Sequence, residues 1–134
     1  MADAVASQII LDGPNKVVMK FTNVSDGSGE SAVTKVDVSA LSKGADGATC
    51  TGVALEQIWW QCLGMKVSIL FDATSDVLAI QLGENQSGHH DYRDFGGIPN
   101  NAGSGVTGDV QFTTVGHSSA DTYTIILAMR KNYG

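Results

Sequence analysis

Histidine, cysteine and the carboxylates are the residues of this chain that could carry chemistry, and they are few. The histidines are His89, His90 and His117. Nucleophilic catalysis needs a base beside a hydroxyl or thiol, and His117 precedes Ser118 in a segment typical of a solvated turn. No spacing singles out a pair of carboxylates for acid and base work. The sequence therefore predicts no catalytic residue and no enzyme.

The run His89-His90-Asp91 offers imidazole and carboxylate donors, which suit a metal ion. Neighbouring residues of a strand point to opposite faces, so we expect these side chains not to converge on one ion. The glycine-rich stretch 96–108 has no phosphate-loop motif and no following helix. We therefore expect no metal and no other cofactor.

Cys50 and Cys62 are the two cysteines. If the segment between them is a strand, they lie on the order of 30 to 40 Å apart, beyond the reach of a disulfide. We expect two reduced thiols, in agreement with folding in a cytoplasm. The N-terminal segment has Asp3 where a secretory signal would be basic, which favours the same compartment.

The elements that must position these groups are strands, because apolar and polar residues alternate along most of the chain. Turn-forming Gly, Asn and Asp residues separate the alternating runs. About eight strands result, and they predict an all-β fold, an antiparallel β-sandwich or jelly-roll-like single domain over residues 1–134. The expected strands are 4–11, 16–22, 32–38, 52–61, 65–71, 77–82, 110–115 and 122–130.

Composition limits the partners. The chain has 134 residues, of which 43% are hydrophobic and 16% charged, and a formal net charge of -6. Its basic residues are scattered singly, which argues against nucleic acid and against an anionic membrane as partners. No segment is apolar for long enough to span a bilayer. The low charged fraction favours contact with another protein.

The segment 52–63 departs from the alternation, because apolar residues fall on both of its faces. Such a strand is central in a stack or covered by another chain; a short helix is the alternative. Trp59 and Trp60 point opposite ways if extended, so one would enter the core and the other would be exposed or meet a partner. The alternative places both in one core.

The segment 87–109 has little regular pattern, and a loop of this length is usually functional or ordered by a partner. Leu70 is a further contact candidate, because it is apolar on the predicted polar face of its strand. Residues 1–7 form a candidate flexible arm that could add a strand to a neighbour's sheet. The predicted partner-binding residues are Trp59, Trp60, Leu70, Phe95, Ile98, Pro99, Asn100 and Asn101.

Four stretches carry a resemblance to a known group of proteins. They are Val18 to Asp37, Phe95-Gly96-Gly97-Ile98-Pro99-Asn100-Asn101, Gly105 to Asp109 and Thr122 to Leu127. In this order they resemble the small virion structural proteins of marine tailed phages such as cyanophages, along nearly the whole chain.

The resemblance implies a capsid decoration, or cement, protein on the outer surface of the capsid. Such a protein binds the major capsid protein, stabilises the expanded head and forms homo-oligomers, as trimers or dimers. The alternative is a carbohydrate-binding or host-adhesion module of a virion fibre or tail. In that case Trp59 or Trp60 would stack on a sugar, with Asp91, Asn100 and Asn101 as hydrogen-bonding groups.

Overall fold

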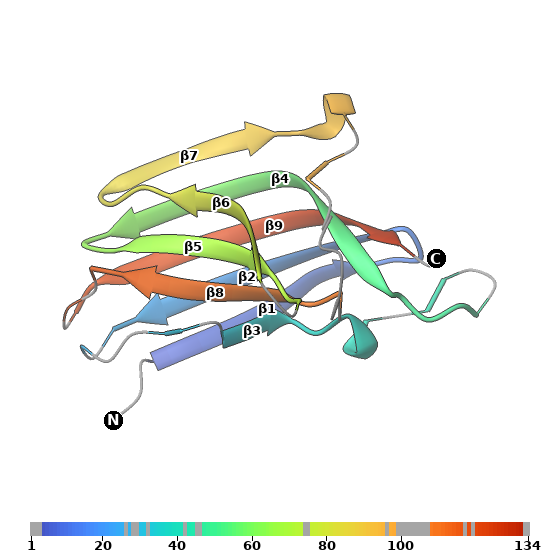
Figure 1. The fold of residues 1–134 in the computed structure, drawn as a ribbon, viewed down its shortest axis with the longest axis horizontal. Helices are drawn as coiled ribbons and strands as arrows, with labels where there is room; N and C mark the ends of the chain where they lie inside the picture. Colours follow the sequence, from blue (N-terminus) through green and yellow to red (C-terminus); the bar gives the residue numbers. More distant parts are fainter. Residues whose placement is uncertain are drawn as a thin grey trace.

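The protein is built almost entirely of strands (Figure 1), as the alternation predicts. One strand, β7 (Gln86–Asp91), was not expected, because it lies mostly within the segment 87–109 that shows little regular pattern in the sequence. The remaining regular elements of the described residues are two short 3₁₀ turns, η1 (Val38–Ala40) and η2 (Arg93–Phe95). The computed structural model describes residues 4–25, 27, 30–31, 33–41, 43–44, 47–73, 76–95, 97–98, 108–116, 118 and 120–132.

The strands form two antiparallel sheets. The first has the order β1-β2-β9-β4-β7 and the second the order β3-β8-β5-β6. The bounds in the first sheet are β1 (Ala4–Asp12), β2 (Lys16–Val24), β9 (Thr122–Asn132), β4 (Gly52–Leu63) and β7 (Gln86–Asp91). Those in the second are β3 (Val33–Val36), β8 (Val110–Val115), β5 (Lys66–Phe71) and β6 (Val77–Leu82).

Strand order identifies the sandwich as a jelly roll. Eight of the strands, in the orders β2-β9-β4-β7 and β3-β8-β5-β6, give the two four-stranded sheets of that fold. β1 is an additional strand that extends the first sheet beyond β2. The predicted fold class is therefore confirmed. The segment 52–63 is the strand β4, paired on both sides, and not a helix.

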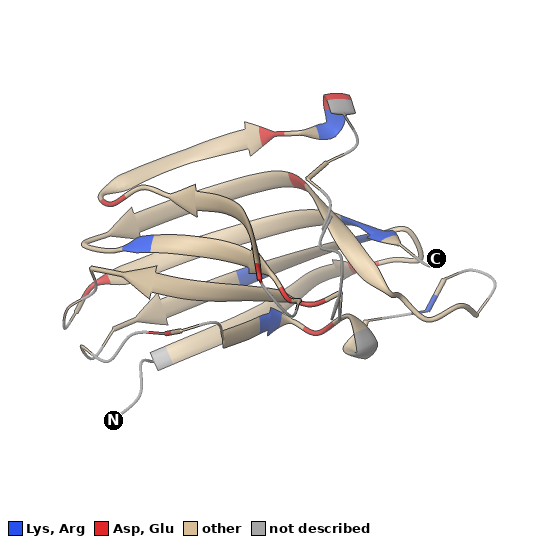
Figure 2. Ribbon diagram, in the orientation of Figure 1, with Lys and Arg blue, Asp and Glu red and all other residues tan. Residues whose placement is uncertain are grey.

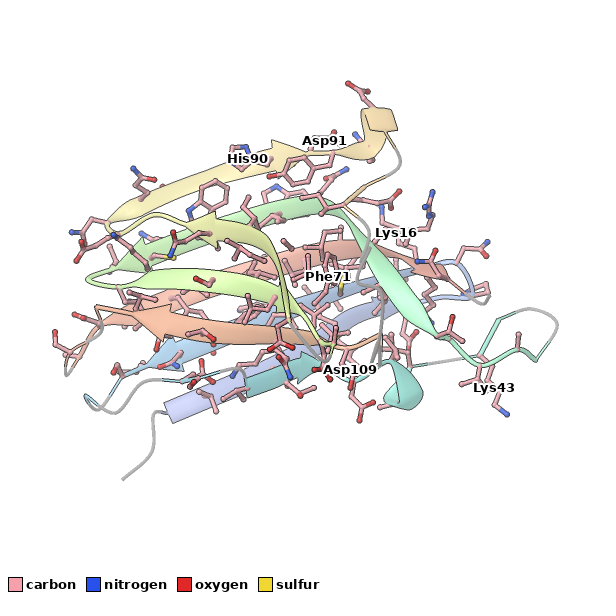
Figure 3. All side chains as sticks on the ribbon, viewed as in Figure 1. Lys16, Lys43, Phe71, His90, Asp91 and Asp109 are labelled. Carbon is pink, nitrogen blue, oxygen red and sulfur yellow. The ribbon has the colours of Figure 1, made fainter. Side chains whose placement is uncertain are left out.

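The core lies between the sheets. Alternate residues of each central strand point inward and are fully buried, as Phe71 of β5 shows (Figure 3). Aromatic rings from the two sheets pack edge to face in this core. The ring centroid of Phe112 in β8 lies 5.2 Å from that of Phe21 in β2 and 5.8 Å from that of Tyr123 in β9. Burial of these side chains supplies the main stabilisation of the fold.

Charged residues are placed mostly at turns and strand ends, and the middle of most strands is uncharged (Figure 2). Because charge is rare in the middle of the strands, their surfaces expose mainly uncharged polar and apolar side chains, which form the candidate sites below.

No helix in the described part of the chain is long and apolar enough to cross a membrane.

The N-terminal segment differs from the expected free arm. Ala4 pairs with Val24 and Ser7 with Phe21 in an antiparallel ladder. The reversal after β1 is closed by the amide of Gly13, which donates to the carbonyl of Lys16 at 2.9 Å. Residues 4–7 thus add a strand to their own sheet, because the hairpin partner is only a short turn away. Residues 1–3 lie outside the described part.

Candidate functional site

Trp59 and Trp60 lie on opposite faces of β4. Trp60 packs against the core between the sheets, whereas Trp59 is on the outer face with 37% of its surface exposed. Adjacent residues of a strand must diverge in this way. The predicted division between a core tryptophan and an exposed one is confirmed, and the alternative with both in one core is wrong.

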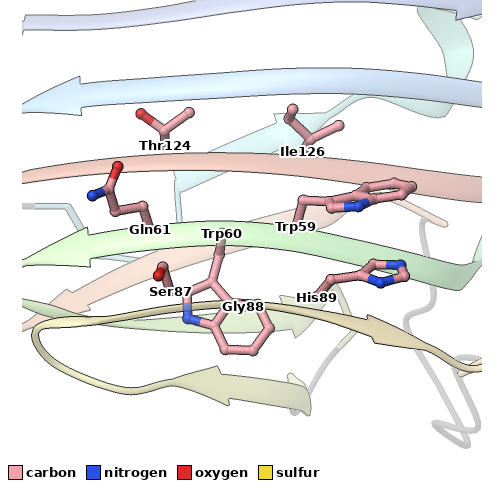
Figure 4. A pocket seen from close by; sticks show the side chains of 8 residues that line it. All are labelled: Trp59, Trp60, Gln61, Ser87, Gly88, His89, Thr124 and Ile126. Atoms are coloured by element: carbon pink, nitrogen blue, oxygen red, sulfur yellow. The ribbon is translucent and has the colours of Figure 1, made fainter.

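Trp59 stands in a row with two side chains from neighbouring strands. It is directly opposite Ile126 of β9 and His89 of β7. The indole and imidazole rings are stacked, with centroids 4.6 Å apart and planes 12° apart (Figure 4). This stacking restricts the rotation of the exposed indole.

A second row lies two residues further along the same strands. Gln61 of β4 is opposite Thr124 of β9 and Ser87 of β7. Both rows line an open depression of about 590 Å³ on the outer face of the sheet (Figure 4). One row is therefore aromatic and aliphatic, and the other carries uncharged hydrogen-bonding groups.

His90 is on the inner face of β7, away from His89. Its ring lies 4.7 Å from that of Trp60 and 5.9 Å from that of Tyr92. The two neighbouring imidazoles therefore point apart, as the strand periodicity predicts. Among the residues described, no group of three or more His, Cys, Asp or Glu side chains could hold a metal ion.

Gly88 leaves room for the ring of Trp60 on β7. A Cβ at Gly88 would lie 3.1 Å from the indole Cη2, closer than ordinary contact. Glycine here lets the large Trp60 ring lie flat beneath β7, at the edge of the core. The inner layer under the depression is thus closely packed, which holds β4 and β7 in place.

Asp91 ends β7 and is clamped by Arg93. Asp91 is labelled in Figure 3. Its carboxylate accepts hydrogen bonds from Arg93 Nε at 3.0 Å and Nη2 at 2.7 Å. These bonds favour the ionised form and lower the pKa of Asp91 from 3.8 to about 2. The clamp lies outside the depression, whose lining does not include Asp91.

We expect Arg93→Ala to raise the pKa of Asp91 toward 3.8, because the guanidinium that stabilises the carboxylate is removed. An NMR titration of the side-chain carboxyl carbon measures this directly. Since the native carboxylate is protonated only near pH 2, its signal in the parent protein stays constant above about pH 4. An unchanged midpoint in Arg93→Ala would show that another group lowers the pKa.

The cysteines are both free and buried. Burial raises the pKa of the Cys62 thiol from 9.0 to about 11, and Cys50 Sγ donates to the carbonyl of Gly52 at 3.2 Å. Because the thiolate is the reactive form, we expect neither cysteine to react with Ellman's reagent in the native protein at pH 8. Both should react in denaturant. Rapid labelling of Cys62 in the native state would contradict its burial.

The second candidate surface is the free edge of β1. Val5, Ile9, Ile10 and Leu11 are each about half exposed, from 49% to 52%. Among the described strands β1 pairs only with β2, and no Asp, Glu, Lys or Arg occurs from residue 4 to residue 11. We call these residues the β1 edge. A free edge that is both apolar and uncharged is a template for pairing with another chain.

The β1 edge overhangs the second sheet. An open depression of about 240 Å³ lies between β1 and β3, lined by Val5 and Ser7 on one side and by Val33 and Lys35 on the other. Val33 is itself 39% exposed. The jelly roll is therefore open along this side, where β1 extends past the last strand of the opposing sheet.

The other predicted contact residues are dispersed. Leu70 is partly exposed on the outer face of the second sheet, opposite Leu78 of β6. Phe95 ends η2. Ile98 forms an isolated bridge with Leu55 through hydrogen bonds of 3.0 and 2.8 Å and packs against the core, so its side chain is not an open contact. Pro99, Asn100 and Asn101 lie outside the described residues.

The strand period predicted that one of Trp59 and Trp60 is exposed, but it showed neither which of the two this is nor what surrounds it. His89, Ile126 and Gln61 join Trp59 only through strand pairing. A strand was expected over 4–11 and an arm over 1–7, but neither expectation identified this strand as an exposed sheet edge, although the unbroken apolar run Ile9-Ile10-Leu11 could have indicated a strand exposed on both faces. That run was the available signal.

Comparison with known proteins gives similarities in structure only. No protein-family model and no curated protein sequence matches the chain. A cupin superfamily protein from Desulfitobacterium hafniense has 10% identity and a TM-score of 0.39, over 98% of this chain and 82% of that one. A family 29 carbohydrate binding module has 6% identity and a TM-score of 0.43, over 95% and 88%.

A chain of the cyanophage Pam1 capsid asymmetric unit is also similar, with 12% identity and a TM-score of 0.39, over 97% of this chain and 86% of that one. At these scores each match is a likeness of the chain trace. The likenesses assign neither an activity nor a partner.

Proposed function

We propose that this protein is a non-enzymatic structural subunit of a phage virion, a capsid decoration protein that binds the major capsid protein and other copies of itself. The observation that carries the proposal is the β1 edge, which combines four half-exposed apolar side chains with a row of backbone groups on the side away from β2. Such an edge is stabilised when a second strand covers it.

Covering the β1 edge with protein is energetically favourable. Full burial of a Val, Leu or Ile side chain contributes about 1.5–3 kcal/mol, so covering each half-exposed side chain of the β1 edge contributes roughly 1 kcal/mol. Natural sheet edges are usually protected by charge, proline or a bulge. Within residues 4–11, β1 has one such protective feature against edge pairing, a shift of register between Ile9 and Leu11.

Self-association follows from the chemistry of β1. Two copies can pair antiparallel through this strand, which makes an isologous interface and one continuous ten-stranded sheet. No like charges oppose each other in such a pairing, because residues 4–11 are uncharged. The opening between β1 and β3 would be covered in the same step.

The sequence resemblance to phage structural proteins supports a capsid as the setting. A decoration protein binds the expanded shell and not its precursor, so it stabilises the expanded state by mass action. Repeated copies that contact both the shell and each other act together through avidity. The uncharged strand surfaces of this protein (Figure 2) suit extended protein contacts of this kind.

We expect the double substitution Ile9→Lys and Ile10→Lys to abolish self-association and shell binding, because it places two charges on the β1 edge. Sedimentation velocity measures the first effect, and cosedimentation with expanded heads of a related phage measures the second. The matched control is Leu78→Lys, which changes an equally exposed apolar residue of β6 and should leave both unchanged.

Two outcomes contradict the proposal. The parent protein could remain monomeric and in the supernatant at every concentration, which would remove the assembly function. Alternatively, the Ile9→Lys and Ile10→Lys variant could bind like the parent protein, which would show that assembly uses another surface. Circular dichroism of each variant confirms that the sandwich remains folded.

A further inference from the structure

We infer that the outer face of the five-stranded sheet binds a neutral carbohydrate chain at Trp59, a function separate from assembly through the β1 edge. The site consists of the two rows described above. Ile126, Trp59 and His89 form the apolar row, and Thr124, Gln61 and Ser87 form the polar row. Both rows line the depression of about 590 Å³ (Figure 4).

The chemistry of the rows matches a sugar ring. A pyranose has faces of C–H groups and a rim of hydroxyl groups. The apolar faces pack on aromatic and aliphatic side chains, and the hydroxyls exchange hydrogen bonds with amides and hydroxyls. Gln61 provides both a donor and an acceptor, and Ser87 and Thr124 do the same. The two rows can thus satisfy both parts of the ring at once.

The uncharged lining of the depression favours a neutral ligand. No Asp, Glu, Lys or Arg lines the larger depression. A phosphate, a sulfate or a uronic acid would find no guanidinium or ammonium group there to replace its hydration. The uncharged hydroxyls of a neutral sugar can be bound by uncharged side chains.

The rows continue across the sheet toward β1. Thr22 of β2 is opposite Thr124, and Lys20 is opposite Ile126. A smaller depression of about 260 Å³ on this part of the face is lined by Ala6, Gln8, Lys20 and Thr22, together with Ser7. Five strands spaced about 4.8 Å apart span roughly 19 Å. A chain of several linked rings can therefore cross the strands from the depression at Trp59, whose lining has no Asp, Glu, Lys or Arg, to the smaller depression, where Lys20 is the one charged side chain of the lining.

Trp59 is held ready for binding. Its indole stacks on His89 at 4.6 Å, so part of its rotational freedom is already lost before the ligand arrives. A ligand then loses less free energy in ordering the site. His89 therefore positions Trp59 in addition to lining the depression itself.

Affinity electrophoresis of the full chain tests the inference. The probes are three soluble neutral polymers, glucomannan, galactomannan and a β-1,3-glucan, with anionic alginate as the comparison. We expect at least one neutral polymer to retard the protein and alginate not to. Trp59→Ala should weaken binding about tenfold or more, because it removes the aromatic surface.

Matched variants separate the site from general surface effects. Leu63→Ala changes another exposed apolar residue of β4, which does not line the depression, and should bind like the parent protein. His89→Ala should weaken binding less than Trp59→Ala, and His89→Phe should restore it by restoring the stacking. The Ile9→Lys and Ile10→Lys variant should keep its affinity, so failure of assembly and failure of sugar binding are measured separately.

Three results would overturn the inference. They are the absence of retardation by every neutral polymer at saturating concentration, unchanged binding by Trp59→Ala, and stronger binding to alginate than to the neutral polymers. Thermal melts of the variants accompany the measurement. Since Trp59 lies on the outer face, its replacement should leave the melting temperature nearly unchanged.

Discussion

Glu30→Ala will destabilise the folded protein by about 3–5 kcal/mol, the cost of removing one partner of a buried ion pair. The side chain of Glu30 is nearly buried between the sheets, and its carboxylate pairs with the ammonium of Lys35. The same carboxylate accepts hydrogen bonds from Asn23 Nδ2 at 3.0 Å and from the Tyr123 hydroxyl at 2.7 Å. Alanine removes all three contacts.

Urea unfolding followed by tryptophan fluorescence measures this effect. Tyr123→Phe is the matched control, since it deletes one hydrogen bond of the same group and should cost about 1 kcal/mol. Glu30→Gln should fall between the two, because the amide keeps an acceptor but loses the charge. A loss for Glu30→Ala no larger than that for Tyr123→Phe would mean that the ion pair does not stabilise the fold.

The contacts of Glu30 explain why one side chain matters so much. Its backbone amide donates to Thr114 Oγ1 at 2.8 Å, and the amide of Thr114 donates to the carbonyl of Glu30 at 3.0 Å. The residue therefore connects β2, β8 and β9 with the start of β3. Because β3 borders the opening beside the β1 edge, this cluster also fixes the geometry of that side of the sandwich.

The fold class was predictable because alternation is a local property. In β9 the inward residues Tyr123, Ile125, Leu127 and Met129 follow one another at every second position. A period of two can be recognised without knowing the partner strand. The same reasoning correctly separated Trp59 from Trp60 and His89 from His90.

Pairing between distant strands was not predictable from the sequence. The row that contains Trp59 exists because β4 lies between β9 and β7, and no local pattern encodes that order. Glu30 was missed for a related reason. The run Asp26 to Glu30 is typical of a solvated turn, yet the cluster formed with Tyr123 and Lys35 buries its last residue.

Asp12→Ala will also destabilise the fold strongly, by about 3–5 kcal/mol, because it leaves a buried charge without this partner. The side chain of Lys131 in β9 is completely buried, and its ammonium pairs with the carboxylate of Asp12 at the end of β1. Asp12 is partly exposed, at 16%, so water can hydrate it when the lysine is removed. Removal of Asp12 alone and removal of Lys131 alone should therefore cost unequal amounts of stability.

A double-mutant cycle tests this inequality. Lys131→Met alone should cost less than Asp12→Ala alone, because it exchanges the buried ammonium for an apolar chain of similar length. The double variant Asp12→Ala with Lys131→Met should recover most of the loss, since replacement of a buried ion pair by apolar groups is often nearly neutral. Equal losses for the two single variants would contradict the argument.

The pair also bears on the proposed assembly through the β1 edge, because it holds the end of β1. In the strand order β1-β2-β9, the contact of Asp12 with Lys131 reaches over β2 and joins β1 to the interior of the sheet. Asp12→Ala should therefore accelerate amide exchange in β1 more than in β9. It should also weaken the proposed self-association, although no residue of the β1 edge is changed. Exchange that is accelerated equally in both strands would show that the pair stabilises the sandwich as a whole and does not specifically hold β1.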